Sequence, residues 1–131
     1  MIVLDTCAII WEALDPSELS QKAATAIHTA NDQQTLMMSD ISIWEISMLM
    51  QKKRLQVNTS AAHFINLFLQ SKNIRVQPIT AEIAELSVTF GSEINNDPAD
   101  RIIAATAIIC NAQLVTADQN LITSKLVNTI W

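Results

Sequence analysis

The chain has 131 residues, of which 50% are hydrophobic and 16% are charged. This length and hydrophobic content suit one globular domain, residues 1–131, whose core needs no disulfide or structural metal, and they exclude a disordered chain. Eight Lys and Arg stand against 13 Asp and Glu, a formal net charge of −5. A broad basic surface for nucleic acid is therefore not expected, but a local site remains possible where a bound cation supplies positive charge.

Nothing in the sequence indicates a membrane or secreted protein. The longest apolar run, residues 102–110, is too short to cross a bilayer, and the amino-terminal residues reach Asp5 without the basic flank of a signal peptide. The two cysteines, Cys7 and Cys110, lie far apart. We expect both to be small buried hydrophobic residues of a cytoplasmic protein with no membrane contact.

Short apolar runs alternate along the chain with longer stretches of helical periodicity. Asp15-Pro16 and Asp97-Pro98 each place a capping residue before a proline at the first helical position. The pattern predicts helices at residues 16–30, 42–54, 60–72, 80–90 and 98–111, and strands at residues 2–4, 36–38, 74–79, 113–116 and 127–130. This alternation is typical of an α/β sandwich with a mostly parallel sheet of four or five strands. Such sheets bind ligands beyond the carboxyl ends of their strands, at the topological switch point.

Four acidic residues stand at the ends of these elements. Asp5 follows the first strand and Asp118 follows the fourth, whereas Glu45 and Asp100 lie in the first turns of two helices. Strand carboxyl ends and helix amino ends share one edge of a parallel sheet, so we expect the four carboxylates to share a crevice. Hard oxygen ligands of this kind suit Mg²⁺ or Mn²⁺.

Each of these acids also has a purely structural interpretation. Glu45 fits a capping box that starts at Ser42, Asp100 suits the positive end of a helix dipole, and Asp118 can cap a helical turn at residues 119–124. Asp5 is harder to explain, because a carboxylate that ends a buried strand needs a partner and no basic residue is near in sequence. The coincidence of four positions, rather than any one of them, predicts a site.

Four segments together carry a family resemblance: residues 2–6 (IVLDT), 43–46 (IWEI), 97–107 (DPADRIIAATA) and 114–118 (LVTAD). In type and order they resemble the motifs of PIN-domain ribonucleases, and above all the VapC toxins of bacterial type II toxin–antitoxin modules. The resemblance spans essentially the whole chain. It implies a three-layer α/β/α fold and Mg²⁺- or Mn²⁺-dependent endonucleolytic cleavage of RNA.

The resemblance also assigns roles by position. It implies that the acidic pocket is formed by Asp5, Glu45, Asp100 and Asp118. Thr6 and Thr116 match polar positions that support the pocket, and we keep Asp97 as a helix cap or supporting residue. A small antitoxin that blocks the pocket and a homodimer are further implications.

A divalent ion is what this chemistry requires. The phosphodiester and the protein are both anionic, and one or two divalent ions would invert the charge of the pocket, polarise the phosphoryl oxygen and activate water. Attack by such a water leaves 5′-phosphate and 3′-hydroxyl ends.

His28 and His63 lie in helical patterns remote from the motifs, and no His- or Cys-based catalytic arrangement is apparent. The alternative is a catalytically silent PIN-like module that binds a structural cation or a basic segment of a partner.

Basic residues that could contact RNA are few. Lys52, Lys53 and Arg54 form the one basic cluster, which suits a helix carboxyl end as well as an RNA phosphate contact. Arg101, beside Asp100, is the better local candidate for a phosphate contact or a structural ion pair.

Overall fold

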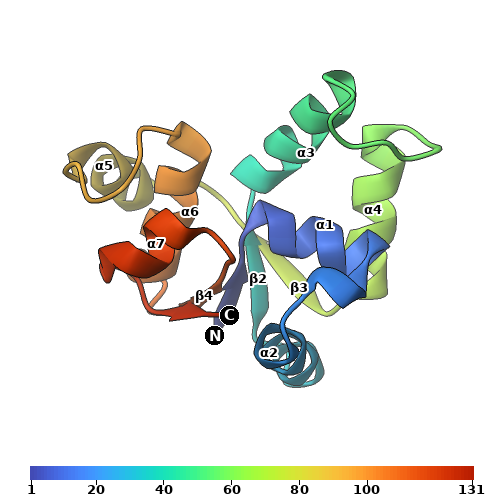
Figure 1. The fold of residues 1–131 in the computed structure, drawn as a ribbon, viewed down its shortest axis with the longest axis horizontal. Coiled ribbons are helices and arrows are strands. Elements are labelled where there is room, and N and C mark those ends of the chain that lie inside the picture. The colour runs from blue at the N-terminus through green and yellow to red at the C-terminus, as the bar shows by residue number, and fades with distance from the viewer.

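A five-stranded sheet forms the centre of the computed structural model, which describes residues 1–131 (Figure 1). Every pair of neighbouring strands is parallel. In the spatial order β3-β2-β1-β4-β5, the strands are β3 (Ile74–Gln77), β2 (Leu36–Ser39), β1 (Ile2–Leu4), β4 (Gln113–Val115) and β5 (Thr129–Ile130). The chain first adds strands on one side of β1 and then on the other, so the topological switch point lies between β1 and β4.

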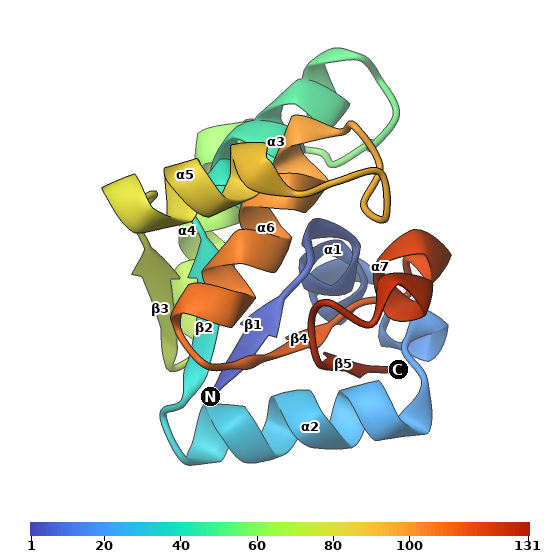
Figure 2. The same cartoon turned by 90° about the vertical axis from the view of Figure 1, so that its left-hand side faces the viewer.

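Helices cover both faces of the sheet, which confirms the predicted three-layer α/β/α arrangement. Alternation along β1 separates the two cores: Ile2 and Leu4 pack on one face, and Val3 packs on the other. The first face is covered by α1 (Thr6–Leu14), α2 (Gln21–Asp32) and α4 (Ala61–Ser71), and the second by α6 (Pro98–Ile109) and α7 (Gln119–Ser124). Helix α5 (Ala81–Thr89) packs against α6. Figure 2 shows α6 lying across the sheet, and α3 (Ile41–Gln51) contacts both α4 and α6.

Helix α1 is an element that the sequence analysis did not predict. Asp5 caps it, because its backbone is extended and its Oδ1 accepts a 2.8 Å hydrogen bond from the Thr6 backbone N–H. The same residue therefore ends β1 and begins α1. With no polar turn between strand and helix, the periodicity gives no boundary there.

The single helix expected over residues 16–30 is wrong in its first turn. Pro16–Glu18 form a 3₁₀ turn, and Leu19 then returns to extended backbone. The Ser20 hydroxyl accepts a 3.0 Å hydrogen bond from the Ala23 N–H and caps α2, which continues to Asp32. The Asp-Pro signal thus marks a short turn, and the serine cap begins the helix.

None of the helices is both long and apolar enough to span a bilayer.

Candidate functional site

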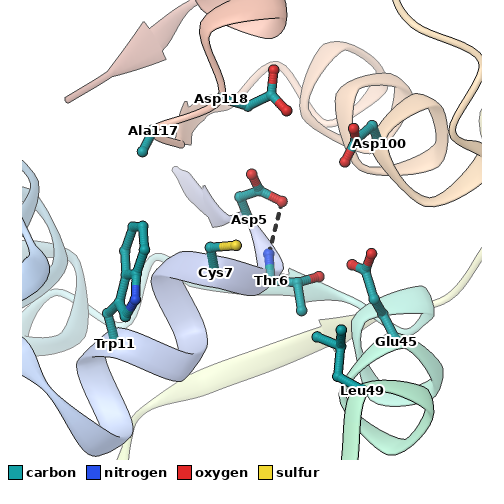
Figure 3. A pocket seen from close by; sticks show the side chains of 9 residues that line it. All are labelled: Asp5, Thr6, Cys7, Trp11, Glu45, Leu49, Asp100, Ala117 and Asp118. Carbon is teal, nitrogen blue, oxygen red and sulfur yellow. Dashed lines mark hydrogen bonds between the residues drawn. The ribbon is translucent and has the colours of Figure 1, made fainter. Parts of the chain in front are cut away.

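A cavity of about 320 Å³ opens at the carboxyl ends of β1 and β4, where the strand order reverses. Its acidic side brings together the four carboxylates that the sequence analysis assigned to one crevice, and an apolar wall faces them (Figure 3). The lining residues are Asp5, Thr6, Cys7, Trp11, Glu45, Leu49, Asp100, Ala117 and Asp118. They come from α1, α3, α6 and the segment after β4, so only the fold brings them together.

Strand register places Asp5 and Thr116 side by side. Leu4 is paired with Val115, and the Asp5 backbone N–H continues the ladder by donating to the Val115 carbonyl at 3.0 Å. The Thr116 hydroxyl then donates to Asp5 Oδ2 at 2.7 Å, while Asp5 Oδ1 accepts from the Thr6 N–H. A carboxylate that is only 6% exposed is therefore held by two neutral donors and by no basic side chain.

Thr116 also positions a second acid of the pocket. Its hydroxyl oxygen accepts a 3.0 Å hydrogen bond from the Asp118 backbone N–H. Asp118 Oδ1 caps α7 by accepting from the Leu121 N–H at 3.0 Å, as one of the two interpretations of this residue predicted. Capping uses one carboxylate oxygen, and the residue still lines the pocket.

Asp97 and Asp100 have different roles at the start of α6. Asp97 Oδ1 accepts a 3.0 Å hydrogen bond from the Ala99 N–H and so caps the helix, and Asp97 does not line the pocket. Asp100 lines the pocket, and its Oδ2 accepts a 3.0 Å hydrogen bond from Asn95 Nδ2. Asn95 carries no signal in the sequence, because an asparagine in a loop before a helix has no pattern that separates it from other turn residues.

The capping-box interpretation of Glu45 is wrong. Helix α3 begins at Ile41 after Asp40, so Ser42 lies inside the helix. Ser42 is fully buried, and its Oγ lies 2.9 Å from the Thr6 hydroxyl, within hydrogen-bond distance. Glu45 is thus not needed as a cap, and it lines the pocket one helical turn further on. Ser42 is a second supporting residue, and the sequence does not reveal this role because its pattern also fits a helix cap.

Burial disfavours ionisation of three pocket acids. Desolvation is the main reason that the pKa of Asp5 and that of Asp100 are both raised to about 6, and neighbouring carboxylates contribute in each case. The pKa of Glu45 is also raised, first by burial and then by Asp97 and Asp100. The two ion pairs of the structure, Lys72–Glu12 and His28–Asp32, involve none of the pocket acids. The pocket is therefore a cluster of acids with no cation to compensate it.

The donor set fits a hydrated hard cation. Carboxylate and hydroxyl oxygens are the groups that Mg²⁺ and Mn²⁺ prefer. No three Asp, Glu, His or Cys side chains are close enough to form a direct ligand set. Mg²⁺ is commonly held by one or two carboxylates while it keeps several waters, and the pocket has room for these waters. The residues that would hold such an ion are Asp5, Glu45, Asp100 and Asp118.

The expectation that Cys7 is buried is wrong. Its side chain is exposed at the pocket, whereas Cys110 is half-buried. Partial desolvation and the surrounding carboxylates raise the pKa of the Cys7 thiol to about 11. The thiol is therefore protonated at neutral pH in the metal-free protein. His28 and His63 are exposed and lie outside the pocket, as expected.

Arg101 has a different role from the two that the sequence suggested. Its guanidinium donates from all of its nitrogens to the loop that precedes α6, including 2.7–3.0 Å bonds to the carbonyl oxygens of Phe90, Gly91, Ile94 and Asn95. It forms no ion pair. With a longer 3.4 Å bond from Nη1 to the Ser87 carbonyl, these bonds engage all five N–H groups of the guanidinium and favour a structural role. Lys52, Lys53 and Arg54 are exposed at the end of α3 and unpaired, so their RNA contact stays a prediction.

We expect Arg101→Lys to destabilise the protein. An ammonium group cannot replace a planar fork that reaches several carbonyls, and the carbonyls left unpaired should cost about 2 kcal/mol of the free energy of unfolding. Urea or thermal unfolding measures this loss, and Arg75→Lys, at an exposed position on β3, is the matched control. Unchanged stability in Arg101→Lys would contradict the structural role.

We expect Asp5→Asn to leave the metal-free protein at least as stable as wild type near neutral pH. The pKa of Asp5 is raised above its unfolded value of about 3.9, so ionisation of the folded protein costs stability at neutral pH, and the cost disappears as pH falls through about 6. An asparagine can keep the Thr6 bond and donate to Thr116, so the variant should gain about 1–3 kcal/mol. Thermal unfolding of both proteins in the presence of a chelator measures this gain in stability.

The same melts with Mg²⁺ provide the control. Binding linkage should raise the wild-type melting temperature, and Asp5→Asn should respond less. Asp32→Asn, whose only ion-pair partner is His28, should behave like wild type. Clear destabilisation of metal-free Asp5→Asn, together with no response of wild type to Mg²⁺, would mean that these acids serve only as caps.

Comparison with known proteins gives two similarities in sequence. The family model of the PIN domain matches residues 2–124. Ribonuclease VapC22 of Mycobacterium tuberculosis is 32% identical over 120 residues, which are 92% of this chain and 88% of that protein.

Solved structures give the same fold. VapBC2 from Rickettsia felis, bound to a DNA fragment from its promoter, matches with a TM-score of 0.74 at 17% identity, over 98% of this chain and 97% of that chain. VapC20 of Mycobacterium tuberculosis, a sarcin-ricin loop cleaving toxin, matches with a TM-score of 0.66 at 18% identity, over 95% of each chain. Fold, family model and sequence identity agree: the chain belongs to the PIN-domain family, among its VapC ribonucleases.

Proposed function

We propose that this chain is a Mg²⁺- or Mn²⁺-dependent endoribonuclease and the toxin of a toxin–antitoxin pair. The observation that carries the proposal is the pocket at the switch point, in which four carboxylates gather without a basic partner. Support comes from the relative that is named a ribonuclease and from the structural neighbour described as a sarcin-ricin loop cleaving toxin. RNA is the proposed substrate.

We assign the pocket residues different roles in phosphodiester hydrolysis. When bound, a divalent cation supplies a Lewis acid and a water of lowered pKa. Asp5 is held rigid by Thr6 and Thr116, so its carboxylate keeps one orientation. Asp100 and Glu45 enter the pocket from α6 and α3 (Figure 3), and together with Asp5 and Asp118 they would hold the ion and its waters. Attack by water yields 5′-phosphate and 3′-hydroxyl products.

We expect cleavage to require both the metal and the carboxylates. Asp5→Asn, Glu45→Gln and Asp100→Asn each weaken cation binding with little change of shape, and each should lower the cleavage rate roughly 100-fold or more. The assay is cleavage of an RNA panel with Mg²⁺, with Mn²⁺ and with EDTA, read by mapping of the RNA ends. Asp32→Asn, far from the pocket and exposed, should retain full activity.

Three outcomes of this assay would overturn the proposal or part of it. Undiminished cleavage in EDTA would exclude the metal mechanism, and full activity of Asp5→Asn would exclude the pocket. If wild-type protein freed of any partner cuts no RNA, the chain is instead a silent PIN-like module that binds a cation or a basic segment.

We also propose a small antitoxin that inserts an Arg or Lys side chain into the pocket. The support is the uncompensated acidic cluster, which an arginine fork suits well, and the structural neighbours that are toxin–antitoxin complexes. Reversing the charge of one basic residue in the antitoxin should relieve inhibition of RNA cleavage. Inhibition that survives reversal of every basic residue, one at a time, would exclude this mode of blocking. The expected homodimer and cytoplasmic location stay predictions.

A further inference from the structure

The Asp100 carboxylate is held from outside the pocket by one side chain. Asn95 Nδ2 donates to Asp100 Oδ2 at 3.0 Å, and Asn95 does not line the pocket. We propose that Asn95 is a positioning residue of the active site, which fixes the orientation of Asp100 and thereby sets the affinity for the divalent cation. This inference rests on the proposed metal-dependent function.

The hydrogen bonds of Asn95 determine which way its amide faces. Its Oδ1 accepts a 2.8 Å bond from the Asp97 backbone N–H, which can only donate. The other side of the amide is therefore the Nδ2 donor, which points at Asp100. A donor at this place stabilises one orientation of the carboxylate, and an acceptor would repel it.

The backbone of Asn95 is anchored on both sides. Its N–H donates to Asn120 Oδ1 at 2.9 Å, and its carbonyl accepts from Arg101 Nε at 2.7 Å. Asn120 lies in α7, which Asp118 caps, and Arg101 lies in α6 beside Asp100. Asn95 thus ties together the amino ends of the two helices that carry pocket acids. The loop cannot shift without breaking several bonds, so the amide is held where Asp100 needs it.

The consequence is a carboxylate with one committed and one free oxygen. Asp100 Oδ2 is occupied by Asn95, and no other hydrogen bond holds the side chain. Without the amide, the carboxylate could rotate away from the pocket, and a cation would have to order it on binding. Loss of such a supporting partner typically weakens metal affinity about 10- to 100-fold.

The test is a Mn²⁺ titration of the full-length chain, followed by electron paramagnetic resonance of the free ion. In Asn95→Ser the hydroxyl can still accept from the Asp97 N–H and preserve the turn, but it is too short to reach Asp100 as the amide does. We expect Mn²⁺ affinity to fall about 10-fold or more. Asn96→Ser makes the same chemical change at the neighbouring exposed residue, and its affinity should stay within about twofold of wild type.

RNA cleavage supplies a second readout. The Mn²⁺ concentration for half-maximal cleavage should rise in Asn95→Ser by the same factor as the dissociation constant, whereas the KM for RNA at saturating Mn²⁺ should not change. A melting temperature equal to that of Asn96→Ser shows that the variant is folded. If Asn95→Ser has a lower melting temperature, a double-mutant cycle with Asp100→Asn separates a positioning role from general destabilisation. If Asn95 acts through Asp100, Asn95→Ser should not change Mn²⁺ affinity further when Asp100→Asn is already present.

The outcomes separate this inference from the proposed function. Wild-type affinity in Asn95→Ser, or an equal loss in the Asp100→Asn background, overturns the positioning role and leaves the metal site intact. No Mn²⁺ binding by wild type overturns both. Weakened binding that is confined to Asn95→Ser and absent from Asn96→Ser establishes that Asn95 acts through Asp100.

Discussion

Parallel pairing of β1 with β4 fixes the carboxylate on which the pocket depends. Because Leu4 is in register with Val115, the residues that follow the two strands, Asp5 and Thr116, lie side by side, and the Asp5 N–H continues the ladder to the Val115 carbonyl. The Asp5 carboxylate is then too buried to be hydrated freely, and it is satisfied by a backbone amide and a hydroxyl. Two neutral donors orient the charge without cancelling it, so a cation that enters the pocket meets a carboxylate that is already in place.

The other acids follow the same principle. Asp100 is held by the amide of Asn95, and Asp118 is held through its backbone and its cap, in each case without an ion pair to a basic side chain. An arginine within the pocket would have stabilised the folded protein, but it would also have competed with the cation for the carboxylates. The one arginine near the site, Arg101, is turned toward the carbonyls of the preceding loop. Its guanidinium stabilises the loop that precedes α6, and the pocket itself stays acidic.

This arrangement of acids lowers the stability of the metal-free protein. Raised pKa values at Asp5 and Asp100 mean that ionisation at neutral pH opposes folding, mainly through desolvation. The two apolar cores on either face of the sheet, and the helix caps around the pocket, offset that cost. On the proposed function, such a pocket would bind an ion, or a basic group of a partner, more strongly than the same acids would on an open surface, because binding would relieve the cost of holding buried carboxylates ionised.

The sequence by itself determined the alternation of strands and helices, the parallel sheet and the four acids at its carboxyl edge, because these depend on local periodicity and on the order of the elements. Tertiary structure decided which partner each side chain has. It made Ser42 a support for Thr6 rather than a cap, turned Arg101 toward backbone carbonyls, exposed Cys7 and selected Asn95 to hold Asp100. Helix α1 was missed for a related reason, since one residue both ends a strand and caps the helix. Residue type and spacing report what a side chain can bond to, whereas the bond that forms depends on groups that only the packed chain brings within reach.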